Sequence, residues 1–335
     1  MLQAYRTLDI DAAPTLSVRD LGVQYRVSGG GFWRRGRSVD AVQDISFDLR
    51  PGETLGLVGE SGSGKTTIGR AVLRRVNASS GKIVFKGTDI TGMQGEPLRR
   101  LRAGMQLVLQ DPYASLNPRM RVLDILAEPL LVHGAVRSVE EARPQVAELL
   151  AMVGLPSDAP DRFPHAFSGG QRQRIGIARA LALKPDLIVA DEPVSALDVS
   201  VRAQVVNLLQ DLQRQLGMSY LFIAHDLSVV RHISHRVAIL YAGRMMELAD
   251  RDAIYERPKH PYTEALLSAV PVANPALQRA RKRIVYQGEI PDIVNPPPGC
   301  RFQTRCPLAS ERCRTQVPPL EEKSPGHFVA CWHRD

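Results

Sequence analysis

Hydrophobic and polar residues alternate in two segments near the start of the chain. Apolar side chains recur at every second position over residues 15–27 and again over 41–49, which is the period of a strand with one buried face. Other short segments are continuously apolar, as in strands of a parallel sheet that are buried on both faces: 54–58, 186–190, 220–224 and 236–241. These patterns predict a sheet assembled from segments spread over most of the chain.

Helical segments separate the predicted strands. One helix is expected from residue 65 to about 76 and another over 201–216. Strands that alternate with helices indicate an α/β fold with a mixed sheet. The segment from about 111 to 184 has a helical pattern without convincing strands, so we expect a helical subdomain inserted into the α/β core.

The composition changes after about residue 255. Proline becomes frequent, as in the run 295–298, and all four cysteines follow residue 299. We therefore expect two domains, one over residues 1–255 and a smaller extension over 256–335.

The overall composition is that of an ordinary globular protein. Hydrophobic residues make up 44% and charged residues 23% of the 335 residues. Apolar runs are shorter than the roughly 20 residues that a membrane-spanning helix needs, and the first residues do not resemble a secretory signal. We expect a cytosolic protein whose membrane association is peripheral. The net charge of +8 would suit nucleic acid or anionic lipid, but the basic clusters are not interleaved with aromatic residues, which argues against nucleic acid.

A glycine-rich loop follows the predicted strand 54–58. Residues 59–66 fit the pattern G-x-x-x-x-G-K-[ST] between a strand and a helix, which is typical of nucleoside triphosphate sites. Backbone N–H groups would surround the β-phosphate, Lys65 would reach the β- and γ-phosphates, and the Thr66 hydroxyl would bind Mg²⁺. Tyr25 is the candidate to stack on the base, although it would serve equally as a half-buried strand residue. The predicted nucleotide-binding set is Tyr25, Gly59, Ser61, Gly62, Gly64, Lys65, Thr66, Thr67 and Asp191.

Polar residues follow three of the apolar strands. Asp191 and Glu192 end one strand, where Asp191 would hold Mg²⁺ and Glu192 would polarise the attacking water, unless both are merely solvated charges. His225 follows the next strand and would touch the γ-phosphate, with a structural loop residue as the alternative. Gln110 follows the apolar residues 107–109 and would reach Mg²⁺ or the water.

A second anion site is predicted at Ser168, Gly169, Gly170 and Gln171. Ser168 suits the N-cap of a helix that continues through residues 174–181, and the exposed N–H groups at such a helix end attract phosphate. One chain with two partial phosphate sites suggests an active site that is completed by a partner.

These motifs together resemble the ATP-binding-cassette (ABC) ATPases over roughly residues 15–250. The resemblance implies a P-loop NTPase with a RecA-like core, in which 59–66 is the Walker A loop, Gln110 the Q-loop residue, 168–171 the signature, Asp198 the D-loop aspartate and His225 the switch histidine. It also implies that two cassettes enclose two ATP molecules, each lying between one Walker A loop and the partner's signature. Phe167 and Val194 depart from common residues of the family without removing a catalytic group, so we expect a competent ATPase.

Two further segments resemble the dipeptide and oligopeptide importers. These are residues 111–119, after the Q-loop, and the segment that begins His260-Pro261-Tyr262-Thr263; residues 219–230 resemble the DppF/OppF-type subunit. This implies a motor subunit for peptide import, acting with a second, related ATPase subunit, two membrane permeases and an extracytoplasmic solute-binding protein at the cytoplasmic face of the inner membrane. Nickel, glutathione or opine-like solutes remain alternatives, as do a cassette ATPase acting on nucleic acid and a non-catalytic redox regulator.

The cysteines at 300, 306, 313 and 331 suggest a metal site. Disulfides are disfavoured in the cytosol, and four thiolates suit either zinc or a [4Fe–4S] cluster. Structural zinc sites favour closely spaced cysteine pairs, which are absent from this sequence, whereas Cys306 is followed by proline as in bacterial ferredoxins. The resemblance to the importer ATPases also implies an iron–sulfur cluster held by Cys300, Cys306, Cys313 and Cys331. We expect this iron–sulfur cluster, with Zn²⁺ as the second possibility and four free thiols as the third. A bound metal would stabilise the small extension by linking its loops.

Overall fold

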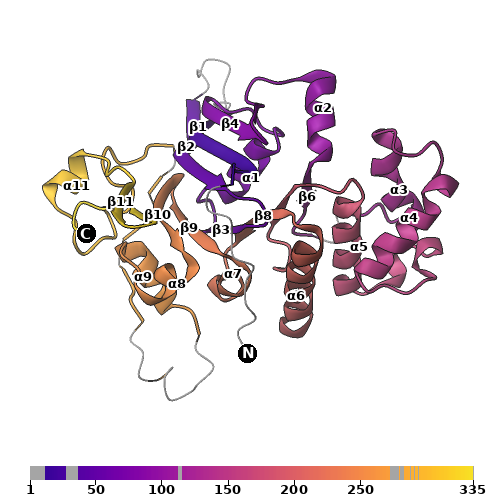
Figure 1. Ribbon diagram of the computed structural model, residues 1–335. Helices are drawn as coiled ribbons and strands as arrows, with labels where there is room; N and C mark the ends of the chain where they lie inside the picture. The colour runs from indigo at the N-terminus through magenta and orange to yellow at the C-terminus, as the bar shows by residue number, and fades with distance from the viewer. Residues whose placement is uncertain are drawn as a thin grey trace. The chain divides into compact units, whose positions relative to one another are not determined.

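The computed structural model (Figure 1) describes residues 12–27, 37–111, 115–271 and 294–334, together with 279, 283–286, 288–289 and 291–292. Residues 112–114 of the importer-like segment, and most of the predicted loop over 28–38, lie outside this part of the chain. Contacts divide the described residues into two units. The first draws on the described residues within 1–16, 48–54 and 85–223, and the second on those within 17–47, 55–84 and 224–335.

The first unit contains a run of three parallel strands. These are β6 (Met105–Val108), β7 (Leu187–Asp191) and β8 (Ser219–Ala224), in the order β8-β7-β6. Val189 of β7 pairs with Leu107 of β6 and with Leu221 of β8. All six residues of β8 are buried, as its continuously apolar sequence predicted. The parallel arrangement sends the carboxyl ends of all three strands to the same edge.

Helices form most of the rest of the first unit. They are α2 (Gly95–Ala103), α3 (Val122–Val132), α4 (Val139–Met152), α5 (Gly169–Leu181) and α6 (Val199–Leu216). The unit also contains the short 3-10 turns η1 (Ala159–Asp161) and η2 (Pro164–Ala166) and the two-residue strand β5 (Thr88–Asp89). Helices α3, α4 and α5 pack against one another (Figure 1). Residues 115–184, all of which the structure describes, contain helices and short 3-10 turns but no strand, as the sequence pattern suggested; that they form an inserted subdomain stays a prediction.

The second unit holds strands of both directions. Strand β3 (Thr54–Val58) is parallel to β9 (Arg236–Tyr241), which is antiparallel to β10 (Arg244–Asp250). The extension adds β12 (His327–Val329) and β11 (Glu321–Ser324), both paired antiparallel. The predicted α/β fold with a mixed sheet is therefore confirmed.

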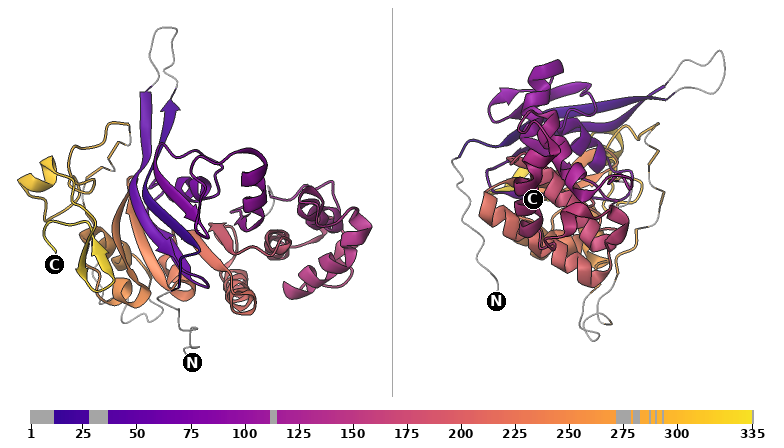
Figure 2. Two further views of the ribbon diagram at one scale, coloured as in Figure 1. Left: turned by 45° about the horizontal axis from the view of Figure 1, so that its top comes forward. Right: turned by 90° about the vertical axis from the view of Figure 1, so that its right-hand side faces the viewer.

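Three strands of the second unit belong to another sheet, in the order β2-β1-β4. They are β1 (Leu16–Val27), β2 (Arg37–Leu49) and β4 (Ser80–Phe85). Figure 2 shows β1 and β2 side by side as long neighbouring strands. Strand β2 begins at Arg37, four residues before the predicted 41, because the strand extends beyond Val42, its first buried apolar residue.

Helix α1 (Lys65–Val72) is shorter than the predicted 65–76. Arg74 has a positive φ of 55°, a left-handed conformation that cannot continue a right-handed helix. The other helices of the second unit that the structure describes are α7 (Leu227–Ile233), α8 (Arg251–Glu256), α9 (Pro261–Ser268) and α11 (Glu311–Thr315). Among the described helices, none combines the length and apolar character needed to cross a membrane.

Candidate functional site

The glycine-rich loop leaves no room for side chains at its two ends. A Cβ at Gly59 would lie 2.2 Å from the Leu240 carbonyl oxygen, and one at Gly64 would lie 2.8 Å from the Ala41 carbonyl oxygen. Gly64 also has a φ of 98°, and Gly62 a φ of 77°, in the left-handed region that favours glycine. Strand β3 and helix α1 can therefore be joined by this tight loop only with glycine at these positions.

Lys65 lies inside this loop. Its Nζ donates hydrogen bonds to the carbonyl oxygens of Gly59 (2.8 Å) and Glu60 (2.9 Å), and its side chain is buried. The Ser63 hydroxyl lies 3.3 Å from the same Nζ. A buried positive charge at the N-terminus of a helix, in a loop whose two end glycines admit no side chain, forms a site suited to phosphate. The residues present thus fit a nucleoside triphosphate.

Tyr25 lies beside the start of α1. Its hydroxyl donates to Thr67 Oγ1 at 3.5 Å, one residue beyond Thr66, and the side chain is partly exposed. The structure therefore brings Tyr25, Lys65, Thr66 and Thr67 together within the second unit. This position is compatible with stacking on a base, which stays a prediction.

The acidic end of β7 has a constrained backbone. Asp191 is the last residue of the strand, and Glu192 has a φ of 48°, which costs a non-glycine residue about 1 kcal/mol. The conformation is held on both sides: the Glu192 N–H donates to the Ile223 carbonyl oxygen (2.9 Å), and the Ser195 hydroxyl donates to the Glu192 carbonyl oxygen (3.0 Å). Strain that the surroundings hold in place is common where a side chain must be aimed.

Gln110 follows β6 by two residues at the same edge. Helix α5 fixes the chain on both sides of it, because Gln173 Nε2 donates to the Leu109 carbonyl oxygen (3.3 Å) and Arg179 Nη1 donates to the Ser115 carbonyl oxygen (2.8 Å). Since β6 and β7 are adjacent parallel strands, Gln110 and Asp191 lie at neighbouring strand ends.

Ser168 is the N-cap of α5, as predicted. Its Oγ accepts a hydrogen bond from the Gln171 N–H (3.3 Å), while the Gln171 side chain accepts one from the Ser168 N–H (3.0 Å), forming a capping box. The helix begins at Gly169, earlier than the segment 174–181. A Cβ at Gly170 would lie 2.3 Å from Val201 Cγ1 of α6, so glycine permits close packing of the two helices.

The remaining predicted residues lie at helix starts. Asp198 caps α6 by accepting a hydrogen bond from the Val201 N–H at 2.9 Å. His225 follows β8 and is exposed, and the next residue, Asp226, caps α7. The first unit thus holds Gln110, Asp191, Glu192, Asp198 and the signature. The second holds the Walker A loop, Tyr25 and His225.

The four cysteines gather in the second unit as free thiols. Burial, together with the neighbouring thiols of Cys313, Cys306 and Cys331, raises the pKa of the Cys300 thiol to about 12. Cys313 Sγ lies 3.4 Å from His333 Nε2. Within the part of the chain that the structure describes, three or more metal-ligating side chains do not meet in an arrangement able to hold a metal ion. The thiols are therefore close but form no ready-made metal cage, and the predicted metal staple is not supported by their geometry.

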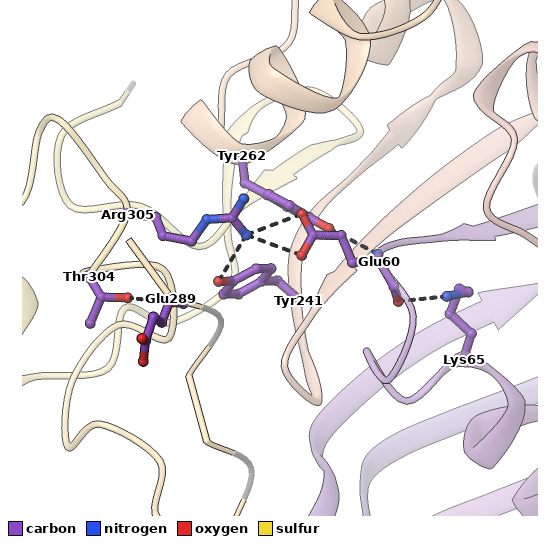
Figure 3. Close-up of polar contacts among 7 residues, drawn as sticks. All are labelled: Glu60, Lys65, Tyr241, Tyr262, Glu289, Thr304 and Arg305. Carbon is purple, nitrogen blue, oxygen red and sulfur yellow. Dashed lines mark hydrogen bonds and ion pairs between the residues drawn. The ribbon is translucent and has the colours of Figure 1, made fainter. Parts of the chain in front are cut away.

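One set of contacts at the Walker A loop could not be predicted from the sequence. Glu60 of the Walker A loop contacts Tyr262 and Arg305, which lie about 200 residues or more away along the chain (Figure 3). Tyr262 belongs to the His-Pro-Tyr-Thr motif, but local sequence patterns carry no information on which loop it would contact.

Comparison with known proteins places the chain in a family. Residues 42–195 match the family described as ABC transporter, and residues 246–313 match the oligopeptide/dipeptide transporter C-terminal region. The chain is 52% identical over 94% of its length to the oligopeptide transport ATP-binding protein AppF of Bacillus subtilis, covering 96% of that protein. It is likewise 52% identical, over 88% of its length and 90% of the relative, to the putative oligopeptide transport ATP-binding protein YkfD of the same organism.

Solved structures of ATP-binding cassettes have the same fold. A dimeric ATP-binding cassette bound to ADP and phosphate has a TM-score of 0.62 at 26% identity, covering 70% of this chain and 98% of the other. The fold is shared as well with cbiO1 of Clostridium perfringens, at a TM-score of 0.62 and 24% identity, over 73% of this chain and 92% of that one. The chain belongs to the ATP-binding proteins of the ABC transporter family and carries the C-terminal region of the oligopeptide/dipeptide transporters.

Proposed function

We propose that this chain is the ATP-hydrolysing motor subunit of an importer for dipeptides or oligopeptides. The observation that carries the proposal is the Walker A loop, in which Lys65 is buried among backbone carbonyl groups between glycines that admit no side chain. The C-terminal region supports the peptide as cargo, because the relatives that share it are named for oligopeptide transport.

The proposed roles follow from the chemistry of each side chain. Lys65 binds the β- and γ-phosphates, and Tyr25 stacks on adenine. Thr66, Gln110 and Asp191 are oxygen ligands of the kind Mg²⁺ prefers. Glu192 orients and polarises the attacking water, and His225 contacts the γ-phosphate. When bound, Mg²⁺ neutralises charge on the phosphates.

The signature acts on a nucleotide held by another subunit. Ser168, Gly169, Gly170 and Gln171 present the N-terminus of α5, which suits the γ-phosphate of that ATP, and Asp198 lies in the D-loop. The proposed partners are a second, related ATPase subunit in a heterodimer, two membrane permeases and an extracytoplasmic solute-binding protein. The chain would then work peripherally at the cytoplasmic face of the inner membrane, with its cassette over residues 1–255 and its extension over 256–335.

Three variants of the purified transporter test the nucleotide roles. Lys65→Ala should abolish ATP binding, because it removes the charge inside the loop. Glu192→Gln should bind ATP but turn over far more slowly and accumulate the closed ATPase dimer. Normal turnover by Glu192→Gln would refute its role towards the water. Ser168→Arg, mixed with a wild-type partner subunit, should impair hydrolysis at the partner's Walker A site.

The cargo is tested on the complete transporter. ATPase activity should rise when the solute-binding protein carries a peptide, and the same assay with nickel or glutathione provides the comparison. Stimulation by one of those solutes alone would replace peptide as the cargo.

We also propose that the four cysteines bind a [4Fe–4S] cluster, with Zn²⁺ as the alternative. The proposal rests on the grouping of Cys300, Cys306, Cys313 and Cys331 in one small region, where each thiol affects the pKa of Cys300. The described thiols are not arranged to hold a metal ion. Binding of the cluster or of zinc therefore requires the four sulfur atoms to move closer to one another and to lose their protons. Metal analysis of anaerobically purified protein decides between iron with sulfide, zinc, and neither.

A further inference from the structure

We infer that the C-terminal extension positions the Walker A loop through Glu60, with Arg305 and Tyr262 as the positioning residues. The inference deepens the proposed function and rests on it. All the residues concerned lie in the second unit.

Glu60 joins the extension to the phosphate site through three of its groups (Figure 3). Its N–H donates a hydrogen bond to the Tyr262 hydroxyl at 3.1 Å, and its carbonyl oxygen accepts one from Lys65 Nζ at 2.9 Å. Its two carboxylate oxygens lie 3.2 and 3.1 Å from Arg305 Nη1. The residue that holds the Lys65 ammonium from one side is thus itself held by the extension from the other.

The ion pair is partly shielded from water. The Arg305 side chain is 18% exposed and that of Glu60 is 28% exposed. Arg305 Nη1 also lies 3.4 Å from the Tyr241 hydroxyl, and its guanidinium carbon lies 5.9 Å from the ring centroids of both Tyr241 and Phe302. A guanidinium held against two aromatic rings loses less freedom on pairing than a surface arginine does, so this pair should contribute more than an exposed one.

Tyr262 is enclosed by aromatic side chains next to the loop. It is almost fully buried and packs against Tyr241 and Phe302, with ring centroids 4.6 and 5.4 Å away. Burial raises the pKa of its phenol, so the hydroxyl stays neutral and its oxygen can accept from the Glu60 N–H.

A buried polar network fixes the start of the helix that carries Tyr262. The His260 ring nitrogen Nδ1 accepts from the Tyr262 N–H (3.1 Å), and the fully buried Glu247 carboxylate accepts from the N–H groups of Lys259 (2.7 Å) and His260 (3.0 Å). His327 of β12 lies 2.6 Å from the same carboxylate. Extension strand β12, sheet strand β10 and helix α9 are thereby tied into one support for Tyr262.

The consequence concerns nucleotide binding more than the chemical step. With the Glu60 N–H and carboxylate engaged by the extension, the loop keeps the shape in which its carbonyl groups surround Lys65 before ATP arrives. Preorganisation of this kind lowers the cost of binding. Losing the ion pair should therefore raise the KM for ATP by roughly threefold to tenfold and change kcat less.

The test compares variants of the assembled transporter. Arg305→Ala should raise the KM for ATP. Arg305→Lys should raise it less, because the ammonium keeps a positive charge beside the carboxylate but lacks the guanidinium plane that lies against Tyr241 and Phe302. Tyr262→Phe should also raise the KM, since it removes only the acceptor for the Glu60 N–H. Arg314→Ala is the matched control, because this arginine of the extension pairs with Glu311 within α11.

The outcomes separate the inference from the proposed function. Glu60→Gln should have little further effect in the Arg305→Ala background, as expected for one shared interaction. Unchanged KM values in both Arg305→Ala and Tyr262→Phe, with a functional wild-type ATPase, would overturn the inference alone. An inactive wild-type transporter, or normal turnover by Glu192→Gln, would instead count against the proposed function. A fall in kcat at unchanged KM would also overturn the inference, because a preorganised loop acts on binding.

Discussion

Replacing Gly170 by alanine should destabilise the first unit, because α5 and α6 are in contact there. The new Cβ would lie 2.3 Å from Val201 Cγ1, whereas carbon atoms in contact are normally about 3.5–4.0 Å apart. One helix must therefore shift by more than about 1 Å, or Val201 must leave its rotamer, and overpacking of this kind typically costs about 1–3 kcal/mol. We expect the free energy of unfolding to fall by that amount.

Gly176→Ala in the same helix is the matched control. A Cβ at Gly176 would meet no described heavy atom within 4 Å, so alanine should stabilise α5 by about 0.5–1 kcal/mol through its better helix propensity. Urea unfolding followed by circular dichroism measures both. The double variant Gly170→Ala, Val201→Ala removes the clashing methyl group and should recover much of the loss, giving a coupling of about 1 kcal/mol or more. If Gly170→Ala were as stable as Gly176→Ala, the close packing of α5 on α6 would be refuted.

Other predictions follow from single contacts. Ser168→Ala removes the acceptor for the Gln171 N–H and should cost about 1 kcal/mol of unfolding free energy; an unchanged urea midpoint would contradict the cap. Tyr25→Ala should weaken binding of a fluorescent ATP analogue while Tyr25→Trp preserves it, and equal affinities would exclude stacking. Burial, aided by Arg334, lowers the pKa of His260 from 6.5 to about 4, so below pH 6.5 the unfolded chain binds a proton that the folded protein does not. Stability should thus fall by about 2 kcal/mol between pH 7 and pH 5. His260→Gln should reduce this dependence, and an equally steep pH profile in the variant would show that other groups cause it.

Most of the nucleotide motifs could be predicted from local sequence. The Walker A loop, the acidic end of β7 and the cap at Ser168 each depend on a few consecutive residues, whose conformation follows from glycine, strand and capping preferences. The same preferences placed β3, β8 and β9 to within a residue or so at each end. The predicted end of α1, at about residue 76, was wrong, because the local sequence does not indicate the left-handed backbone conformation of Arg74.

The long-range contacts could not be predicted in this way. Glu60 and Arg305 are separated by 245 positions, and Glu247 and His327 by 80. From the neighbouring residues along the chain, each of these side chains would be predicted to be an exposed, solvated charge. For the cysteines, the local sequence predicted more than the fold provides. The four thiols lie near one another, but among the described residues they are not arranged to hold a metal ion.

The sequence by itself determined the class of this protein, an ABC-type ATPase, and where its glycine-rich loop, acidic strand end and Ser-Gly-Gly-Gln segment lie along the chain. Each is encoded within a short segment, so its identity survives without knowledge of the fold. Only the tertiary structure decided what holds these segments in place, namely Val201 against Gly170 and the extension against Glu60. The physical reason is that packing and ion pairing depend on distance in space, which chain folding sets and local preferences do not.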